Sequence, residues 1–457
     1  MRTKELLNCF EVGALSSSIV ADVQVSGAEL DTRKLECGNI FFACNGEQVD
    51  GNAYAQSALT QGASVAVMDN KKFYENVIGN KILVRDSKQA VIALGKQRLA
   101  ALKAKKIAIT GSYGKTTTKD ILKGVAGLKY KVQSAQGNHN NLLGVLLTAC
   151  GIEDETEILI FELGSNAMGE IEELSQLVCP NIVIITGVGY AHVGNFGSIA
   201  NTKREKLSIV NGLSGHADDS DYGVVIARDT LADDILELAG KRGFKAIFYG
   251  ATDKADYQLA GYKFDGNWLH FSIKTDKGEL KARIPYPYPH IAEDYLAGFA
   301  LAGLLNIPYK DVVKLVAEYI AVDGRGDILF TNNRKLTVIN DTYNASLEAV
   351  IAAIKSLALR TEAKKYALLG EIGEINGYEA DIYGALLDEA AKQPNINFIF
   401  SGLHYKGYKQ ATNIRIVTGE KATKDALADV KSGVILIKAS HSKGFDRYVK
   451  YLAEDRI

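Results

Sequence analysis

A glycine-rich loop between an apolar strand and a polar helix is the feature of this sequence that most limits how the chain can fold. Ile107–Thr110 predicts a buried strand, Gly111-Ser112-Tyr113-Gly114-Lys115-Thr116-Thr117 follows it, and Lys119–Leu128 predicts a helix. Glycines let backbone N–H groups approach phosphate oxygens, and a helix N-terminus adds positive potential. We therefore expect a nucleotide-phosphate site in an α/β domain, where Lys115 reaches the terminal phosphates and the Thr116 hydroxyl binds Mg²⁺.

The alternative for this loop is an ordinary glycine turn that threonines cap. The usual phosphate-loop spacing would place a further glycine where this chain has Ile109, so the loop is a shortened variant. A turn needs neither a lysine after the second glycine nor several threonines at a helix start. The residues therefore favour the phosphate site.

Length and the order of apolar runs indicate three α/β domains. At roughly 100–200 residues per domain, 457 residues suggest two to four domains. We expect a small first domain at 1–102, a central nucleotide-binding domain at 103–320 and a doubly wound third domain at 321–457. A linker helix at Gln89–Lys105 is expected near the first boundary.

Short apolar runs alternate with helical patterns, which predicts right-handed crossovers and mostly parallel sheets. The expected strands are Ile40–Ala43, Ser64–Met68, Glu157–Phe161, Asn181–Ile185, Gly223–Ile226, Ala246–Tyr249, Leu336–Ile339, Tyr366–Leu369, Asn397–Phe400, Ile414–Val417 and Val434–Ile437. The pattern changes to short alternating strands over Tyr257–Ile284, which predicts an antiparallel flap.

Composition excludes several classes of function. Lys+Arg 53 against Asp+Glu 54 leaves a net charge of -1, so no positive excess exists for a nucleic acid or an anionic membrane. The 5 cysteines are scattered without a CxxC pair, which argues against a disulfide framework or a zinc site and favours the cytoplasm. The longest apolar span, Tyr295–Ile307, is too short to cross a bilayer, and no signal-peptide pattern is present.

Polar residues follow two further predicted strands, at the ends where open α/β sheets bind ligands. Glu162 is placed to bind magnesium beside the phosphate loop, although a lone glutamate at a strand end is usually a cap. His192 and Lys203 follow the next strand, and each alone is more often an ordinary surface residue. The amides of Asn138, Asn140 and Asn141 suit either a turn or polar substrate groups.

The third domain offers a second set of candidates. Ser346 is a plausible helix N-cap, and Asp341, Tyr343 and Asn344 just before it could meet a nucleotide across an interdomain cleft. Arg325 lies in a Gly-Arg-Gly hinge, where it suits either a phosphate or a surface ion pair. The local sequence leaves these two roles open.

Taken together, these segments resemble the Mur ligases, the ATP-dependent amino-acid-adding enzymes of peptidoglycan precursor synthesis, over essentially the whole chain. The D-alanyl-D-alanine-adding type is the most similar. The resemblance rests on Leu30–Arg33, Phe42–Glu47 with Asp50-Gly51, Gly111–Thr118, Asn138–Gly144, Glu162-Leu163-Gly164, Gly169-Glu170-Ile171, Ala191-His192, Phe196-Gly197-Ser198, Asp341–Ala345 and Leu369-Gly370-Glu371. It implies a uridine-substrate domain, a central ATPase-like domain and a Rossmann-like C-terminal domain that closes over ATP.

The resemblance also gives the candidate residues roles. It implies catalytic roles for Lys115, His192, Lys203 and Arg325, and nucleotide contacts by Gly111, Ser112, Gly114, Lys115, Thr116, Thr117, Asp294, Arg325, Asp341, Tyr343 and Asn344. It implies substrate contacts by Asp31, Thr32, Arg33, Asn45, Gly46, Asn138, Asn140, Asn141, Lys438 and Ser440. Two Mg²⁺ ions would be bound by Thr116, Glu162, His192 and Lys203, with Lys203 carbamylated.

Two segments depart from the family pattern. Asp294 stands where the family has an asparagine near the adenine, and Lys438-Ala439-Ser440-His441 replaces a Lys-Gly-Ser-Arg element. Gly187 and Leu146 replace the asparagine and proline that are usual there.

The resemblance implies a reaction and its partners. ATP would phosphorylate the carboxylate of UDP-N-acetylmuramoyl-tripeptide, and the amine of D-alanyl-D-alanine would displace the phosphate. This reaction would serve cell-wall synthesis, cell shape and cell division. The enzyme would be a cytoplasmic monomer. The alternatives are a Mur-type ligase with another amine substrate and a non-catalytic binder of nucleotide or UDP-sugar.

Overall fold

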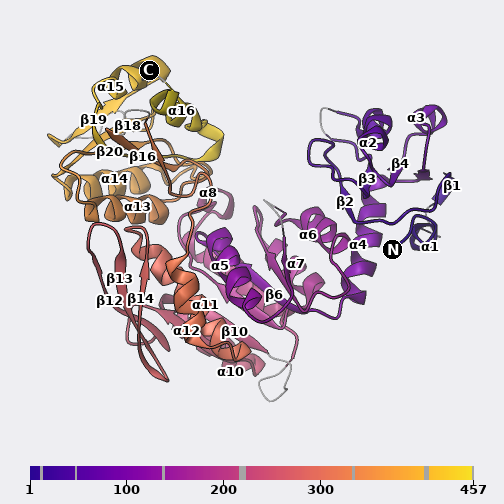
Figure 1. Ribbon diagram of the computed structural model, residues 1–457, viewed down its shortest axis with the longest axis horizontal. Coiled ribbons are helices and arrows are strands. Elements are labelled where there is room, and N and C mark those ends of the chain that lie inside the picture. Colours follow the sequence, from indigo (N-terminus) through magenta and orange to yellow (C-terminus); the bar gives the residue numbers. More distant parts are fainter. Residues whose placement is uncertain are drawn as a thin grey trace. The chain divides into compact units, whose positions relative to one another are not determined.

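The computed structural model describes residues 1–10, 14–46, 49–135, 139–215, 223–331, 335–405 and 411–454 (Figure 1). The chain forms two compact units. The first comprises Met1–Ala108, Tyr130–Ser165 and Glu173–Pro180, and the second Ile109–Lys129, Asn166–Glu172 and Asn181–Ile457. The predicted mostly parallel α/β fold is confirmed, whereas the exact boundaries of the three predicted domains stay a prediction.

The first unit contains a five-stranded sheet in the order β1-β5-β4-β3-β2. Its strands are β1 (Ala14–Ser18), β2 (Gly27–Glu29), β3 (Asn39–Phe42), β4 (Val65–Met68) and β5 (Lys81–Val84), and only β1 pairs antiparallel, with β5. Because β3 and β4 are apolar on both faces, each face needs a covering layer.

Helices cover both faces of this sheet. Phe41 and Ala66 pack toward α2 (Ala55–Thr60) and α3 (Lys71–Asn76), and the alternate residues Ile40 and Val65 pack toward α4 (Ser87–Ala101) and α1 (Leu6–Cys9). The linker helix was predicted at Gln89–Lys105. It begins earlier because Asp86 caps it through Gln89 N, and it ends at Ala101 because Leu102 is extended and Lys105 enters β6 (Lys105–Thr110).

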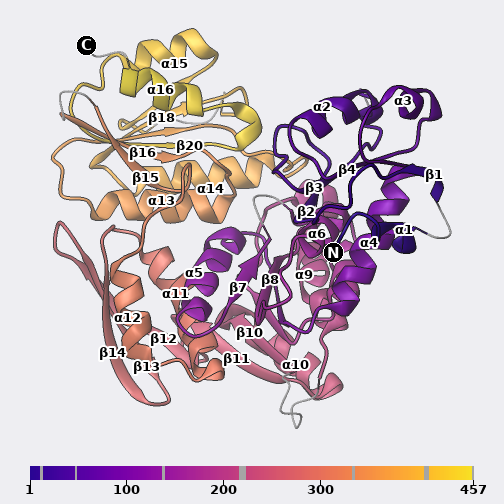
Figure 2. The same cartoon turned by 45° about the vertical axis from the view of Figure 1, so that its right-hand side comes forward.

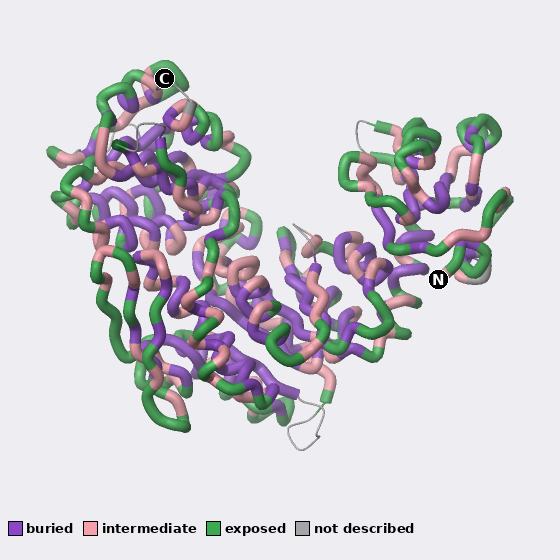
Figure 3. Tube along the Cα trace, in the orientation of Figure 1, coloured by how far each residue is buried: buried purple, intermediate pink, exposed green. Residues whose placement is uncertain are grey.

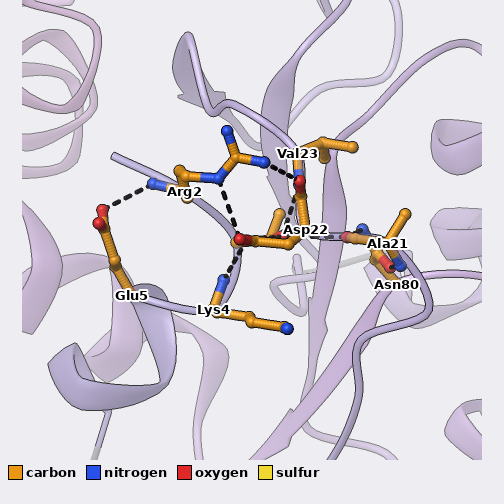
Figure 4. Close-up of polar contacts among 8 residues, drawn as sticks. Arg2, Lys4, Glu5, Ala21, Asp22, Val23 and Asn80 are labelled. Carbon is orange, nitrogen blue, oxygen red and sulfur yellow. Dashed lines mark hydrogen bonds and ion pairs between the residues drawn. The ribbon is translucent and has the colours of Figure 1, made fainter.

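A polar cluster joins the N-terminus to the loop that precedes β2 (Figure 4). Arg2 Nε lies 2.9 Å from Asp22 Oδ2, and Lys4 N donates to Asp22 Oδ1 at 3.1 Å. Asn80 Nδ2 donates to Ala21 O at 2.8 Å, while its Oδ1 accepts from the backbone of Val20 and Ala21. The hydrogen bond from Arg2 lowers the pKa of Asp22. The cluster fixes the connection between β1 and β2 to the N-terminal segment and to the residue just before β5.

The first unit also contains part of the central region of the chain. There β7 (Val132–Ser134) pairs in parallel with β8 (Ile158–Glu162), and α6 (Leu142–Cys150) packs on α4 and β2. Leu147 and Cys150 of α6 belong to the same apolar cluster as the strands of the first sheet.

In the second unit, strands β9 (Ile182–Ile185), β10 (Val224–Arg228) and β11 (Lys245–Gly250) are parallel neighbours. They continue into an antiparallel meander of β12 (Tyr257–Phe264), β13 (Leu269–Thr275) and β14 (Gly278–Ile284), which confirms the predicted flap. Helices α5 (Lys115–Gly127) and α11 (Pro289–Leu305) pack against each other beside these strands (Figure 2). The other helices here are α8 (Val193–Phe196), α9 (Ile199–Leu207), α10 (Ala232–Arg242) and α12 (Tyr309–Ala317), while α7 (Glu170–Val178) begins in this unit.

The C-terminal sheet has the order β15-β16-β20-β17-β18-β19. Its strands are β15 (Asp327–Phe330), β16 (Leu336–Asp341), β17 (Lys365–Leu369), β18 (Ile396–Ser401), β19 (Ile414–Val417) and β20 (Gly433–Lys438), and only β15 is antiparallel. Helices α13 (Leu347–Leu359) and α14 (Glu379–Ala391) cover one face, and α15 (Glu420–Leu427) and α16 (Asp446–Glu454) cover the other. The strands are buried between these layers (Figure 3), which confirms a doubly wound sheet.

Candidate active site

The phosphate loop connects β6 to α5, which begins at Lys115 rather than at the predicted Lys119. Gly111 has a φ of 151°, and a Cβ atom there would lie 2.1 Å from Thr186 Oγ1, so no larger residue fits. Ser112 N donates to Gly187 O at 2.7 Å. Lys115 Nζ donates to Gly111 O at 2.7 Å. The loop is therefore packed on the segment after β9, with its lysine folded over it and the start of α5 behind it, the arrangement that suits an anion.

The segment after β9 carries His192 just before α8. His192 has a left-handed backbone with a φ of 60°, and its Nδ1 lies against Glu374 Oε2. Burial lowers the pKa of His192; Glu374 opposes this effect, and the charges of Lys115 and Lys206 add to it. His192 therefore lies within electrostatic reach of the lysine of the phosphate loop, and its role as a metal ligand stays a prediction.

Lys203 does not have the surroundings expected of a carbamylated lysine. Its Nζ forms an ion pair of 3.0 Å with Asp234, and its side chain is 40% exposed. Lys206, about one helical turn further along α9, is 1% exposed. Burial, and after it the charge of Lys115, lower the pKa of Lys206 to about 7. The structure thus places Lys206 near the phosphate loop and pairs Lys203 with a carboxylate of α10.

Asp294, predicted to contact the nucleotide, is buried against the phosphate loop. Its Oδ1 lies 3.4 Å from the position of a Cβ atom on Gly114, and 3.7 Å from Arg228 Nη2. Burial raises the pKa of Asp294 to about 7, while Arg228 acts in the opposite direction. Arg228 also pairs with Glu293 at 2.7 Å and lies over the ring of Tyr113 at 5.7 Å. A buried charged cluster thus supports the loop from one side.

Arg325 joins the C-terminal part of the second unit to the phosphate loop. Its Nη2 donates to Thr116 Oγ1 at 3.1 Å, and its guanidinium lies 4.1 Å from the centre of the Tyr343 ring. Of the two roles that the sequence left open, this contact favours a phosphate role over a surface ion pair. Thr117 follows in the first turn of α5.

Two residues predicted to bind substrate hold loops of the C-terminal sheet, and their contact with substrate stays a prediction. Lys438 Nζ lies 2.8 Å from Asp341 Oδ2 and donates to Asn344 O at 2.9 Å. Ser440 Oγ accepts from Gly373 N at 2.8 Å. Asp341 and Asn344 are therefore brought together by a buried lysine. Ser346 caps α13 through Ala349 N, as predicted.

The predicted uridine-substrate residues lie in two turns of the first unit. Asp31 binds the Arg33 guanidinium with both oxygens, the shortest distance being 2.6 Å, and Arg33 lowers the pKa of Asp31 to about 2. Thr32 lies between them, partly exposed. Asn45 forms a β-bridge with Asp50, next to the exposed Gly46. Contacts within the first unit thus hold the Asp31–Arg33 turn.

The predicted amides divide between structural and open roles. Asn141 caps α6 by accepting from Gly144 N at 2.9 Å. Asn140 Nδ2 donates to Glu162 Oε1 at 3.4 Å, and Glu162 is buried at the end of β8. Asn138 lies outside the described residues. Asn140 and Glu162 are thus brought together, as a shared site requires.

Within the described ranges, no group of three or more His, Cys, Asp or Glu side chains is gathered as a metal site. Of the residues predicted to bind Mg²⁺, Thr116 and His192 lie in the second unit, beside the loop that suits phosphates. Because Mg²⁺ takes few protein ligands and is completed by substrate phosphates and water, this donor set fits a nucleotide-bound metal. None of the described helices has both the length and the apolar character needed to cross a bilayer.

Comparisons with known proteins agree with this geometry. The family model described as "Mur ligase middle domain" matches residues 109–302, and "Mur ligase family, catalytic domain" matches residues 24–107. The UDP-N-acetylmuramoyl-tripeptide–D-alanyl-D-alanine ligase of Bacillus subtilis (strain 168) is 30% identical over 453 residues, which cover 97% of this chain and 96% of that protein. The ligase of the same name from Escherichia coli (strain K12) is 26% identical over 95% of each chain.

Solved structures share the fold. MurF from Acinetobacter baumannii has a TM-score of 0.82 at 23% identity and covers 99% of this chain and 98% of its own. MurF ligase from Thermotoga maritima, in complex with ADP, has a TM-score of 0.78 at 22% identity, with coverages of 94% and 98%. The chain belongs to the Mur ligase family.

Three residues near the loop were missed by reasoning from the sequence: Lys206, Arg228 and Glu374. Lys206 gave no local indication, because the other residues buried on its helix, Thr202 and Glu205, are polar. Arg228 and Glu374 gave no local indication, since their partners are distant in the sequence.

Proposed function

We propose that this chain is an ATP-dependent ligase that joins D-alanyl-D-alanine to UDP-N-acetylmuramoyl-tripeptide in peptidoglycan precursor synthesis. The names of the full-length relatives support this substrate pair. The observation that carries the proposal is the contact of Arg325 with Thr116, because it brings a cation from the hinge before the C-terminal sheet to a phosphate loop that already holds Lys115.

The chemical need is a better leaving group on the acceptor carboxylate. Transfer of the terminal phosphoryl group of ATP to that carboxylate gives an acyl phosphate and ADP. The amine of D-alanyl-D-alanine then attacks the acyl carbon, and phosphate leaves. Lys115 and Arg325 would offset the negative charge that develops on the phosphoryl oxygens. Exclusion of water would protect the acyl phosphate from hydrolysis.

Mg²⁺ would be held by the Thr116 hydroxyl and the His192 imidazole, and would supply charge neutralisation at the phosphates. A magnesium role for Glu162 stays a prediction. We assign the carbamylated position to Lys206 instead of Lys203. Carbamylation needs a neutral amine, and the burial of Lys206 beside the charge of Lys115 disfavours its ammonium form. A carbamate there would replace a cation by an oxygen donor of opposite charge.

The uridine nucleotide would be bound by the turn at Asp31, Thr32 and Arg33 and the turn at Asn45 and Gly46. Asn140 beside Glu162 would face the peptide end of the same substrate. Asp341, Tyr343 and Asn344 would contact the nucleotide from the C-terminal sheet, where Lys438 holds their loop in shape. The monomeric state and the cytoplasmic location also stay predictions.

A substrate panel tests the function. ADP formation is measured with UDP-N-acetylmuramoyl-tripeptide alone, with added D-alanyl-D-alanine, and with single amino acids as alternative amines. The proposal expects ADP release, and a product whose mass is the sum of the two substrates less one water, only with the dipeptide. Release with a different amine would indicate another Mur-type ligase. Nucleotide binding without release under every condition would indicate a non-catalytic relative.

A further inference from the structure

The C-terminal sheet places a carboxylate against a candidate metal ligand of the phosphate-loop region. Glu374 lies in the connection between β17 and α14, and its Oε2 faces His192 Nδ1. The Glu374 carbonyl accepts from Gly194 N at 3.1 Å, two residues beyond that histidine. Both the side chain and the backbone of Glu374 therefore contact the segment that carries His192.

The backbone on both sides of this contact is held in an uncommon conformation. His192 has a φ of 60° and Glu374 a φ of 59°, and they are two of the four non-glycine residues with positive φ in the described part of the chain. Such conformations persist only where the surroundings enforce them, and they gather at functional sites. A Cβ atom on Gly194 would lie 2.7 Å from Asn376 N, so the close approach of these two segments requires glycine there.

The chemistry of the contact fixes which ring nitrogen carries the hydrogen. An ionised carboxylate only accepts hydrogen bonds, so the ring form that suits this contact carries its hydrogen on Nδ1, the atom that faces Glu374. In a neutral imidazole the lone pair is then on Nε2, and a metal binds a histidine nitrogen through its lone pair. A carboxylate behind a metal-binding histidine orients the ring and raises its basicity.

We propose that Glu374 is a positioning residue that holds His192 with Nε2 available to the metal, so that metal binding by His192 depends on this carboxylate from the connection between β17 and α14. The proposal rests on the proposed function for the identity of the metal as Mg²⁺. It goes further because it assigns a residue of the C-terminal region, Glu374, to the metal site, in addition to the contact of Arg325 with the phosphate loop.

The ring state of His192 can be read without substrates. The full chain is labelled with ¹⁵N-histidine, and a His192→Asn variant identifies the signal among the 7 histidines. In metal-free wild type we expect the neutral ring with hydrogen on Nδ1. The Glu374→Ala variant should show a mixture of both neutral forms, whereas Glu374→Gln, whose amide oxygen still accepts, should keep the Nδ1 form. Hydrogen on Nε2 in the wild type would overturn the proposal.

Metal affinity gives the second readout. Mg²⁺ is titrated into each protein in the presence of ADP while the His192 signal is followed. Loss of an oriented carboxylate partner lowers metal affinity about 10–100-fold in comparable sites, so Glu374→Ala should need at least about 10-fold more Mg²⁺. An unchanged titration midpoint would contradict the proposal.

Tyr378→Phe is the matched control. Tyr378 lies in the same connection, and its hydroxyl donates to Gly197 O at 2.8 Å, so the variant removes a docking contact without touching His192. Tyr378→Phe should keep the ring form and the Mg²⁺ midpoint of the wild type. If Tyr378→Phe and Glu374→Ala changed them equally, the loss of a contact between the two segments would explain both variants, and a positioning role for Glu374 would be refuted. If Glu374→Ala unfolds, Glu374→Gln replaces it in the test, and its titration midpoint is expected at a several-fold higher Mg²⁺ concentration than in the wild type. Since neither readout uses peptide substrates, a wrong substrate assignment leaves the test of Glu374 intact.

Discussion

The guanidinium of Arg325 donates a hydrogen bond of 3.1 Å to the hydroxyl of Thr116. This contact joins the hinge before the C-terminal sheet to the first turn of the phosphate-loop helix. A cation in this position meets the oxygens of a bound triphosphate, where charge develops during phosphoryl transfer. The two residues thus link the position of the C-terminal sheet to catalysis.

Replacement of Arg325 should therefore impair turnover far more than folding. We expect Arg325→Ala to lower kcat/KM for ATP about 100-fold, the size typical for loss of one charge-stabilising donor. Arg325→Lys should retain part of the activity, because the positive charge remains. It should not reach the wild-type value, because the planar pair of guanidinium donors is lost. The matched control is Arg283→Ala, which also removes an arginine stacked on an aromatic ring, Trp268 at 4.2 Å, on the flap. Equal losses in both alanine variants would contradict the role of Arg325.

The two lysines of α9 should behave differently. Lys206→Ala should lose most activity, and a small added carboxylic acid such as formate should restore part of it by supplying the missing oxygen donor. Lys203→Ala should retain most activity, since it removes a half-exposed ion pair with Asp234. Carbon-13 NMR after equilibration with labelled bicarbonate should show a carbamate in Lys203→Ala and none in Lys206→Ala. The opposite pattern would return the assignment to Lys203.

Glu205 should be important for stability. Its buried carboxylate accepts from Gly169 N at 2.6 Å and from Ile171 N at 2.8 Å, at the start of α7. Glu205→Ala leaves two N–H groups without this acceptor, so we expect a loss of about 3 kcal/mol in the free energy of unfolding. The control Glu237→Ala removes an exposed carboxylate paired with Lys241 and should leave the unfolding midpoint almost unchanged. Urea titrations of both variants measure the difference, and similar midpoints would refute the prediction.

Asp294 should give the fold a measurable pH dependence. Burial raises its pKa to about 7, so between its ordinary pKa near 4 and that value the folded chain binds more protons than the unfolded chain. The contribution of Asp294 to stability is therefore greatest at low pH and is lost as the pH rises toward 7. The measured quantity is the difference in unfolding free energy between the wild type and Asp294→Asn. This difference should fall by a few kcal/mol at most over this pH range, because a change of one in a pKa corresponds to about 1.4 kcal/mol. A flat difference would show that Arg228 keeps Asp294 ionised throughout.

The sequence predicted most elements of this fold because their information is local. The apolar runs of the C-terminal sheet became β16 to β20, and Ser346 became the cap of α13. The error at the linker helix was also local: a lysine-rich run suits a helix, yet Lys105 is the first residue of a strand.

The arrangement of the candidate site was less predictable. Lys203 and Lys206 share one helix, and only packing decides which of them is buried. The partners of His192 and Thr116 come from segments far along the chain, so no local pattern indicates Glu374 or Arg325. Residue types could be predicted, whereas pairings required the tertiary structure.

Transfer of isotope from the acceptor carboxylate tests the central claim most directly. UDP-N-acetylmuramoyl-tripeptide with ¹⁸O in that carboxylate is incubated with ATP, Mg²⁺ and D-alanyl-D-alanine, and the released phosphate is analysed by mass spectrometry. Reaction through an acyl phosphate predicts one ¹⁸O atom in each phosphate, and no phosphate release by Lys115→Ala. Release of unlabelled phosphate together with the ligated product would contradict this mechanism.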